Sequence, residues 1–168
     1  RKYKNGSIKY PEIATKQNLI DFKKRIDENK KKCIEFLTNE KSAGKSIHVY
    51  GASTKGNVIL QYFKLNTDLI DYAAERSPWK WGKYTVGTMI PCVSEEDARK
   101  AQPDYFLVLP YAFFNEFFER EKDWRDRGGK FIVPLREEPL LSEKFSVECM
   151  DQRKLQKKLT RDPCMSRD

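Results

Sequence analysis

The segment Ser46-Ile-His-Val-Tyr-Gly-Ala-Ser-Thr-Lys-Gly-Asn57 gives the clearest indication of architecture in the chain. Its first five residues are rich in β-formers and predict a short strand. A loop bounded by two glycines follows, and residues 57–63, Asn-Val-Ile-Leu-Gln-Tyr-Phe, predict a helix with a capping residue at its start. A strand, a glycine loop and a helix in this order begin a βαβ unit.

The flanking sequence continues this alternation. Before the segment, an apolar stripe at helical spacing predicts a long amphipathic helix over 16–39 with these buried residues: Leu19, Phe22, Ile26, Cys33 and Leu37. After it, apolar segments predict strands over 69–74, 89–93, 104–110 and 130–135. A helix is expected after Ser94, and another carries an aromatic face made by Phe113, Phe114, Phe117, Phe118 and Trp124.

Helices that alternate with strands favour a parallel sheet with right-handed crossovers. We therefore expect an α/β, Rossmann-like three-layer domain with about five strands in the order 3-2-1-4-5, preceded by the long helix. The expected domain spans 16–140, between an N-terminal extension at 1–15 and a flexible charged tail at 141–168 with a short helical possibility at 152–159. Because the chain starts at Arg1 and shows no secretory signal, we expect a piece of a longer polypeptide.

The positive charge is concentrated near the start of the chain. Residues 1–45 hold 13 basic and 6 acidic side chains, whereas residues 46–140 hold 13 and 14. The central domain is thus nearly neutral, and the basic run at 23–32 is interpreted as the solvated face of a helix rather than a nucleic-acid patch. No apolar run is long enough for a membrane span, so neither a nucleic-acid nor a membrane partner is expected.

The cysteines are widely spaced, and the sequence has one histidine, His48. This spacing does not favour a zinc site, and we expect reduced thiols and a cytoplasmic location. His48 lies within the first predicted strand, where we expect a packed neutral ring rather than a general base. The four cysteines are Cys33, Cys92, Cys149 and Cys164.

The loop after the first strand is a candidate anion site, although it matches neither the Walker motif nor the dinucleotide fingerprint. Gly51 permits a tight turn, and Gly56 permits close backbone approach at a helix N-terminus. Two hydroxyls and a charge are added by Ser53, Thr54 and Lys55. Glu75 directly follows the second predicted strand, where a carboxylate commonly accepts hydrogen bonds from sugar hydroxyls. The structural alternative is a turn with an exposed lysine.

Several ordered blocks carry a family resemblance. They are Val49-Tyr-Gly-Ala-Ser-Thr-Lys-Gly-Asn57, Ile70-Asp-Tyr-Ala-Ala-Glu-Arg-Ser-Pro78, Gly82-Lys-Tyr-Thr-Val-Gly-Thr88, Ile90-Pro91, Pro103-Asp-Tyr-Phe-Leu-Val-Leu-Pro110 and Gly128-Gly-Lys-Phe-Ile-Val-Pro134. Over residues 16–140 the chain resembles the C-terminal domain of nucleotide-sugar C-methyltransferases, which build branched deoxysugars. A complete enzyme of that family also has a zinc-binding segment and an S-adenosylmethionine domain with the acid/base residues.

The resemblance implies a domain that positions a nucleotide-diphosphate sugar, alongside an S-adenosylmethionine-binding domain in the parent protein. The zinc cysteines, the cofactor loop and the catalytic groups have no counterpart here, so we expect no cofactor in this chain, no catalytic residue and no methyl transfer by the chain alone. The nucleotide-phosphate loop would consist of Gly51, Ser53, Thr54, Lys55, Gly56 and Asn57. The adjacent strand end and loop would add Glu75, Arg76 and Lys83. Many members have Trp-His where this chain has Tyr111-Ala112, and the Tyr111 hydroxyl is the candidate replacement for that polar contact.

Two other classes of protein stay open. The first is a non-catalytic interaction or scaffold module, in which the basic helix binds an acidic partner or nucleic acid. The second is a nicotinamide oxidoreductase, which is the least favoured because the loop lacks the middle glycine and the chain has no Tyr-x-x-x-Lys pair.

Overall fold

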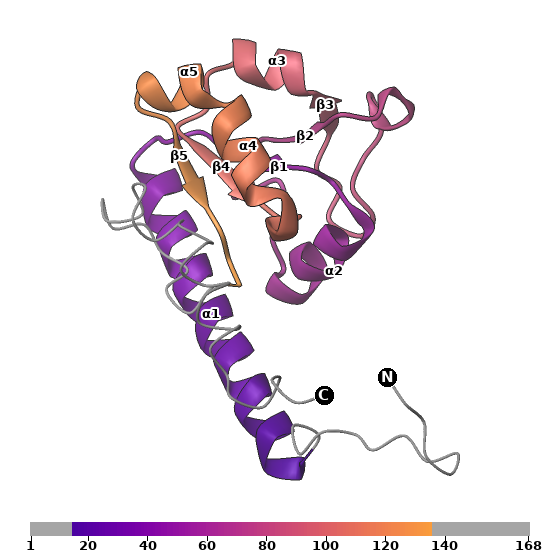
Figure 1. Cartoon of the computed structure of the whole chain (residues 1–168), viewed down its shortest axis with the longest axis vertical. Coiled ribbons are helices and arrows are strands. Elements are labelled where there is room, and N and C mark those ends of the chain that lie inside the picture. The colour runs from indigo at the N-terminus through magenta and orange to yellow at the C-terminus, as the bar shows by residue number, and fades with distance from the viewer. Residues whose placement is uncertain (1–14, 136–168) are drawn as a thin grey trace, which may run out of the picture.

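The computed structural model describes residues 15–135, which form a parallel five-stranded sheet between two layers of helices (Figure 1). The strand order is β3-β2-β1-β4-β5, and all four pairings are parallel. The strands are β1 (Ile47–Tyr50), β2 (Tyr72–Glu75), β3 (Cys92–Ser94), β4 (Tyr105–Val108) and β5 (Lys130–Ile132). The predicted α/β fold and its strand order are therefore confirmed.

The helices divide between the two faces of the sheet according to the alternation of side chains along the strands. Ile47 and Val49 belong to a core shared with α1 (Lys16–Ser42) and α2 (Thr54–Phe63). Tyr50 belongs to the opposite core. That second core contains residues of α3 (Glu95–Lys100), α4 (Phe114–Arg120) and α5 (Lys122–Asp126). Two short 3₁₀ turns, η2 (Pro78–Lys80) and η3 (Tyr111–Phe113), complete the described elements.

The strands are shorter than the apolar segments that predicted them. The third strand starts only at Cys92, because Met89 has a left-handed φ of 55° and Pro91 forms an antiparallel bridge to Tyr84. The single aromatic helix expected from Phe113 to Trp124 is divided into η3, α4 and α5. The expected extension, the tail and its helical segment, together with Cys149 and Cys164, lie outside the described residues.

The buried stripe predicted for the long helix is correct only in its C-terminal half. Cys33 and Leu37 are fully buried, whereas Leu19 and Phe22 are 61% and 54% exposed. Figure 1 shows the reason: the N-terminal half of α1 extends beyond the sheet, so no described strand lies beneath it. The spacing of apolar residues correctly predicted which face of the helix is apolar. It did not predict how much of that face the rest of the domain covers.

Two carboxylates link the amino end of β1 to its neighbouring strands: Asp104 precedes β4 and Asp71 precedes β2. Asp104 accepts hydrogen bonds from the amide and the hydroxyl of Ser46, both at 2.9 Å, and pairs with Lys45. Asp71 accepts from the Ile47 amide at 2.9 Å and pairs with Lys41. These contacts satisfy the amides of Ser46 and Ile47 at the amino edge of the sheet.

His48 is a buried, neutral ring in the middle of β1, as the sequence analysis expected. It is 2% exposed and packs edge-on against Tyr72 at 5.2 Å and near Phe106 at 6.2 Å between ring centroids. Burial lowers the pKa of His48 to about 4. The charged imidazolium is therefore excluded from the folded protein around neutral pH.

This histidine predicts how stability depends on pH. Its folded-state pKa lies below the ordinary 6.5, so the full stabilisation is present above pH 6.5 and is lost as the pH falls toward 4. Between pH 7 and pH 5 we expect the free energy of unfolding to fall by about 2 kcal/mol, which urea denaturation measures. The variant His48→Phe keeps a packed ring without a titrating group and should lose most of this dependence. An equal pH slope in both proteins would contradict the assignment.

Candidate functional site

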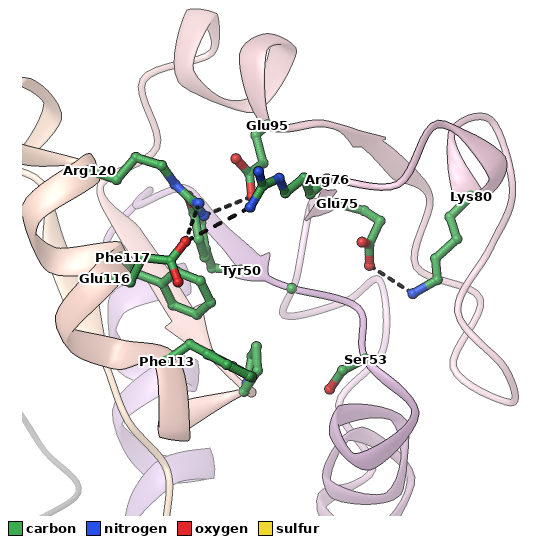
Figure 2. A pocket seen from close by; sticks show the side chains of 12 residues that line it. Tyr50, Ser53, Glu75, Arg76, Lys80, Glu95, Phe113, Glu116, Phe117 and Arg120 are labelled. Carbon is green, nitrogen blue, oxygen red and sulfur yellow. Dashed lines mark hydrogen bonds and ion pairs between the residues drawn. The ribbon is translucent and has the colours of Figure 1, made fainter.

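A cavity of about 270 Å³ opens at the carboxyl edge of the sheet, where β1 lies between β2 and β4 (Figure 2). Chains leaving β1 and β4 depart to opposite faces here, which is the position where open α/β sheets bind ligands. The lining residues come from the ends of several strands and from α4. They are Tyr50, Gly51, Ser53, Glu75, Arg76, Lys80, Glu95, Pro110, Phe113, Glu116, Phe117 and Arg120.

The loop after β1 forms one wall of this cavity through a glycine turn and a helix start. Gly51 has a φ of +83°, and a Cβ there would lie 2.6 Å from Cγ of Pro110, so both the conformation and the space require glycine. Ser53 then caps α2, its Oγ accepting from the Gly56 amide at 3.0 Å. The first amides of a helix have no acceptor within the helix, and the N-terminus of α2 therefore presents partial positive charge beside the cavity.

Three cations and three carboxylates alternate around the cavity. Lys80 pairs with Glu75 at 2.9 Å and also donates to the Ala52 carbonyl at 2.9 Å. Arg120 pairs with Glu95 at 3.0 Å. The formal charges of the lining balance, and a ligand anion must therefore compete with carboxylates already in place.

The third pair is the loosest and crosses the mouth of the cavity. Arg76 follows β2 and approaches Glu116 of α4 at 3.9 Å (Figure 2). The Arg76 side chain is 78% exposed, so this pair contributes little to stability. Arg76 is thus the cation that can turn toward an incoming anion at the lowest cost.

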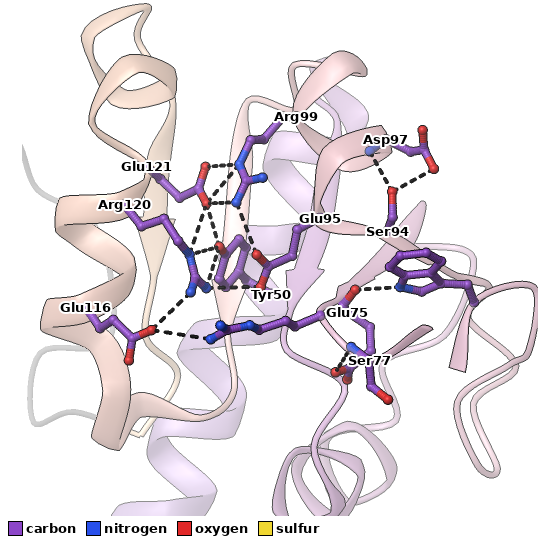
Figure 3. Close-up of polar contacts among 12 residues, drawn as sticks. Tyr50, Glu75, Ser77, Ser94, Glu95, Asp97, Arg99, Glu116, Arg120 and Glu121 are labelled. Carbon is purple, nitrogen blue, oxygen red and sulfur yellow. Dashed lines mark hydrogen bonds and ion pairs between the residues drawn. The ribbon is translucent and has the colours of Figure 1, made fainter. Parts of the chain in front are cut away.

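A buried network fixes the position of Arg120 behind the cavity (Figure 3). The Tyr50 hydroxyl donates to Glu121 and accepts from Arg120 Nη2 at 2.9 Å. Arg99 holds the same Glu121 carboxylate with Nε and Nη2 at 2.8 and 2.6 Å. Burial acts to raise the pKa of Glu121, but hydrogen bonds from Arg99 and Tyr50 outweigh it, and the pKa lies below its ordinary value. Glu121 therefore stays ionised at neutral pH.

Of the ten residues singled out from the sequence, four line the cavity: Gly51, Ser53, Glu75 and Arg76. Glu75 is 8% exposed and is already engaged, since it accepts from the Ser77 amide at 3.1 Å as well as from Lys80. A sugar hydroxyl at this carboxylate would share it with these two donors.

The other six candidates lie elsewhere. Thr54 and Lys55 are exposed on the first turn of α2, and Tyr111 is exposed in η3. Asn57 donates to the Ser53 carbonyl at 3.2 Å, and the Lys83 carbonyl accepts from the Cys92 amide at 2.7 Å. The sixth, Gly56, is buried against Leu109.

Sequence reasoning missed the half of the cavity that α4 and the loop after β2 supply. Lys80, Glu95, Phe113 and Arg120 are far apart in sequence and belong to no short motif. A usable signal was their position, because Lys80, Glu95 and Phe113 each lie within about five residues after a strand, where side chains reach the carboxyl edge of a parallel sheet.

The strand order, the glycine turn and the crevice define a Rossmann-like α/β domain with a cavity at its switch point. Residues 9–136 match the family described as the C-methyltransferase C-terminal domain, and the chain belongs to this family. It is 36% identical over 99 residues to the C-methyltransferase NovU of Streptomyces niveus, an alignment that covers 59% of this chain and 24% of that relative. The matched region thus spans about a quarter of the relative.

Within residues 15–135, none of the helices is both long and apolar enough to cross a membrane. The same range contains no group of three His, Cys, Asp or Glu side chains that could hold a metal ion.

Gly56 provides a test of whether the glycine loop serves packing. A Cβ at this position would lie 2.8 Å from Cβ and 2.9 Å from Cδ1 of Leu109, which is 1% exposed. Gly56→Ala should therefore lower the free energy of unfolding by about 1–3 kcal/mol in chemical denaturation. Lys55→Ala, at the exposed neighbouring position, is the control and should change it by less than about 0.5 kcal/mol. Equal stability of the two variants would show that the loop moves away from β4 without cost.

Proposed function

We propose that this domain binds a nucleotide-diphosphate sugar in the cavity at the carboxyl edge of the sheet and positions it for methyl transfer by another domain of the parent enzyme. The observation that carries the proposal is the joint presence, around one cavity, of a helix N-terminus, three cations, three carboxylates and aromatic rings. Membership of the C-methyltransferase family supports it independently.

The diphosphate would lie between the start of α2 and the cations of the opposite wall. Backbone amides at a helix N-terminus favour phosphate oxygens. Arg76 is the mobile partner, since its contact with Glu116 is long and exposed. Arg120 is the fixed one, because Tyr50 and Glu95 both hold its guanidinium. A guanidinium can bind phosphate oxygens through two parallel hydrogen bonds, which a point charge cannot do.

The carboxylates of the cavity would accept hydrogen bonds from the hydroxyl groups of the sugar. A lining whose charges cancel is poorly suited to a bare polyanion, whereas sugar hydroxyls can donate to the carboxylates while the phosphates bind the cations. Glu75 and Glu95 face the cavity from the ends of β2 and the start of α3. Phe113 is 58% exposed at the rim and is placed to stack on a nucleobase.

The methyl donor and the acid/base groups would belong to other domains. In this proposal S-adenosylmethionine and zinc bind outside this chain, the product is a branched deoxysugar nucleotide, and the parent enzyme works in the cytoplasm. A domain that only positions the substrate still contributes to rate, because it replaces a bimolecular encounter by an oriented one. The Tyr111 hydroxyl, exposed next to the rim residue Phe113, stays a candidate for a further sugar contact.

Calorimetric titration tests this proposal. The full chain should bind thymidine or guanosine diphosphate sugars, and Arg76→Ala should weaken binding about tenfold, as expected for loss of one charge-assisted hydrogen bond. Arg127→Ala is the matched control, since Arg127 is also an exposed arginine but bonds Gln102, away from the cavity. Lys55→Ala distinguishes phosphate binding by the exposed loop from binding inside the cavity, because Lys55 does not line the cavity. An unchanged affinity would favour a phosphate position inside the cavity.

The other two classes of protein predict different results in thermal unfolding and in titration with other ligands. If the sugar nucleotides fail to raise the thermal midpoint and only polyanions do so, the chain is an interaction module that acts through its basic helix. Binding of reduced nicotinamide with equal or higher affinity would favour an oxidoreductase. Equal loss of affinity in Arg76→Ala and Arg127→Ala would remove the site assignment.

A further inference from the structure

A second cavity lies on the opposite layer of the domain, between the N-terminal half of α1 and α2. This α1–α2 groove has a volume of about 320 Å³ and is lined mainly by Phe22, Ile26, Val58, Tyr62 and Leu135. Val58 is 66% exposed, which is high for a valine on a helix that is otherwise packed on the sheet. The apolar surface continues along α1 past Phe22 to Leu19.

Apolar surface of this kind usually marks a place where another segment binds. Within residues 15–135, no side chain covers Val58, Phe22 or Leu19. Leu19 and Phe22 are among the residues that the helical spacing of α1 predicted to be buried. The pattern therefore indicates a covering segment that lies outside the described part of the chain.

The end of the described chain identifies which segment can reach the groove. Leu135 is both the last described residue and part of the groove lining. Figure 1 shows the chain that leaves β5 running alongside α1 toward the N-terminal half of that helix. Residues 136–168 therefore start at the groove itself, and a tethered segment binds at a high effective concentration.

The chain that follows Leu135 has the length and composition that the groove requires. An extended chain covers up to about 3.3 Å per residue, so ten residues reach about 33 Å. The distance along α1 from Ile26 back to Leu19 is only about 10 Å at a rise of 1.5 Å per residue. The segment 136–148 reads Arg-Glu-Glu-Pro-Leu-Leu-Ser-Glu-Lys-Phe-Ser-Val-Glu and offers four apolar side chains, Leu140, Leu141, Phe145 and Val147.

The charges of the two partners are also complementary. Residues 136–148 hold four acidic and two basic side chains, whereas residues 16–32 of α1 hold seven basic and three acidic ones. Lys23 lines the groove, and Arg25 lines its continuation toward Leu19. Arg25 forms no ion pair within residues 15–135, which leaves its guanidinium available for a carboxylate such as Glu143.

We propose that residues 137–148 of this chain bind in the α1–α2 groove, with their apolar side chains against Phe22 and Val58 and their carboxylates toward the basic side chains of α1. The bound segment completes the apolar packing of the first half of α1. This surface is on the layer of the domain away from the sugar-nucleotide cavity, and the proposal is independent of that assignment.

Hydrogen–deuterium exchange of the full chain, read by mass spectrometry, tests this. The double variant Leu141→Asp/Phe145→Asp should speed exchange of the amides of residues 17–26 by about tenfold, since loss of the covering segment allows the helix start to open. Ser142→Asp/Ser146→Asp adds the same charges at polar positions and should leave exchange unchanged. Val58→Asp, at an exposed position, should reproduce the fast exchange from the side of the groove.

Three results would overturn the proposal. Exchange of these amides in the unaltered chain as fast as in the double variant would show that the groove is open. Protection that grows with protein concentration would assign the groove to a second copy of the chain. An equal effect of the serine variants would show that added charge alone, rather than loss of apolar contact, loosens the helix.

Discussion

The close approach of the loop after β1 to the end of β4 is the constraint on which the rest of the structure depends. Two glycines allow it: a Cβ at Gly51 would collide with Pro110, and one at Gly56 would collide with Leu109. This approach sets α2 on one face and η3 with α4 on the other, directly after neighbouring parallel strands. The crevice between them is thus a consequence of backbone packing, before any polar side chain is considered.

The electrostatics of the crevice follow from where its charges are anchored. Arg120 is held by Tyr50 and Glu95, and Tyr50 is in turn bonded to the buried Glu121. A buried carboxylate of this kind is tolerated only because Arg99 supplies two hydrogen bonds to it. The cavity therefore has one rigid side, built on α3 and α4, and one adaptable side at Arg76. Such a division suits a ligand that is first attracted by charge and then oriented by fixed donors.

The sequence was informative where local pattern and tertiary structure agree. Strand, glycine turn and helix around Gly51 predicted the parallel order correctly, because crossovers of one hand leave few alternatives. It was less informative where the contacts are distant in the chain. Tyr50, Glu95 and Arg120 form one cluster, but their spacing in the sequence does not predict that they are in contact. The helical stripe that includes Leu19 was also only half correct, since periodicity identifies an apolar face without saying what covers it.

The two aspartates at the amino edge of the sheet give the domain a functional polarity. Asp71 and Asp104 close that edge by binding the backbone at the start of β1 and the side chains of Lys41 and Lys45. Substitutions at the opposite, carboxyl rim can then change the lining of the cavity without removing the contacts that anchor β1. The cavity lining and the anchoring of the sheet are in this way separable by mutation.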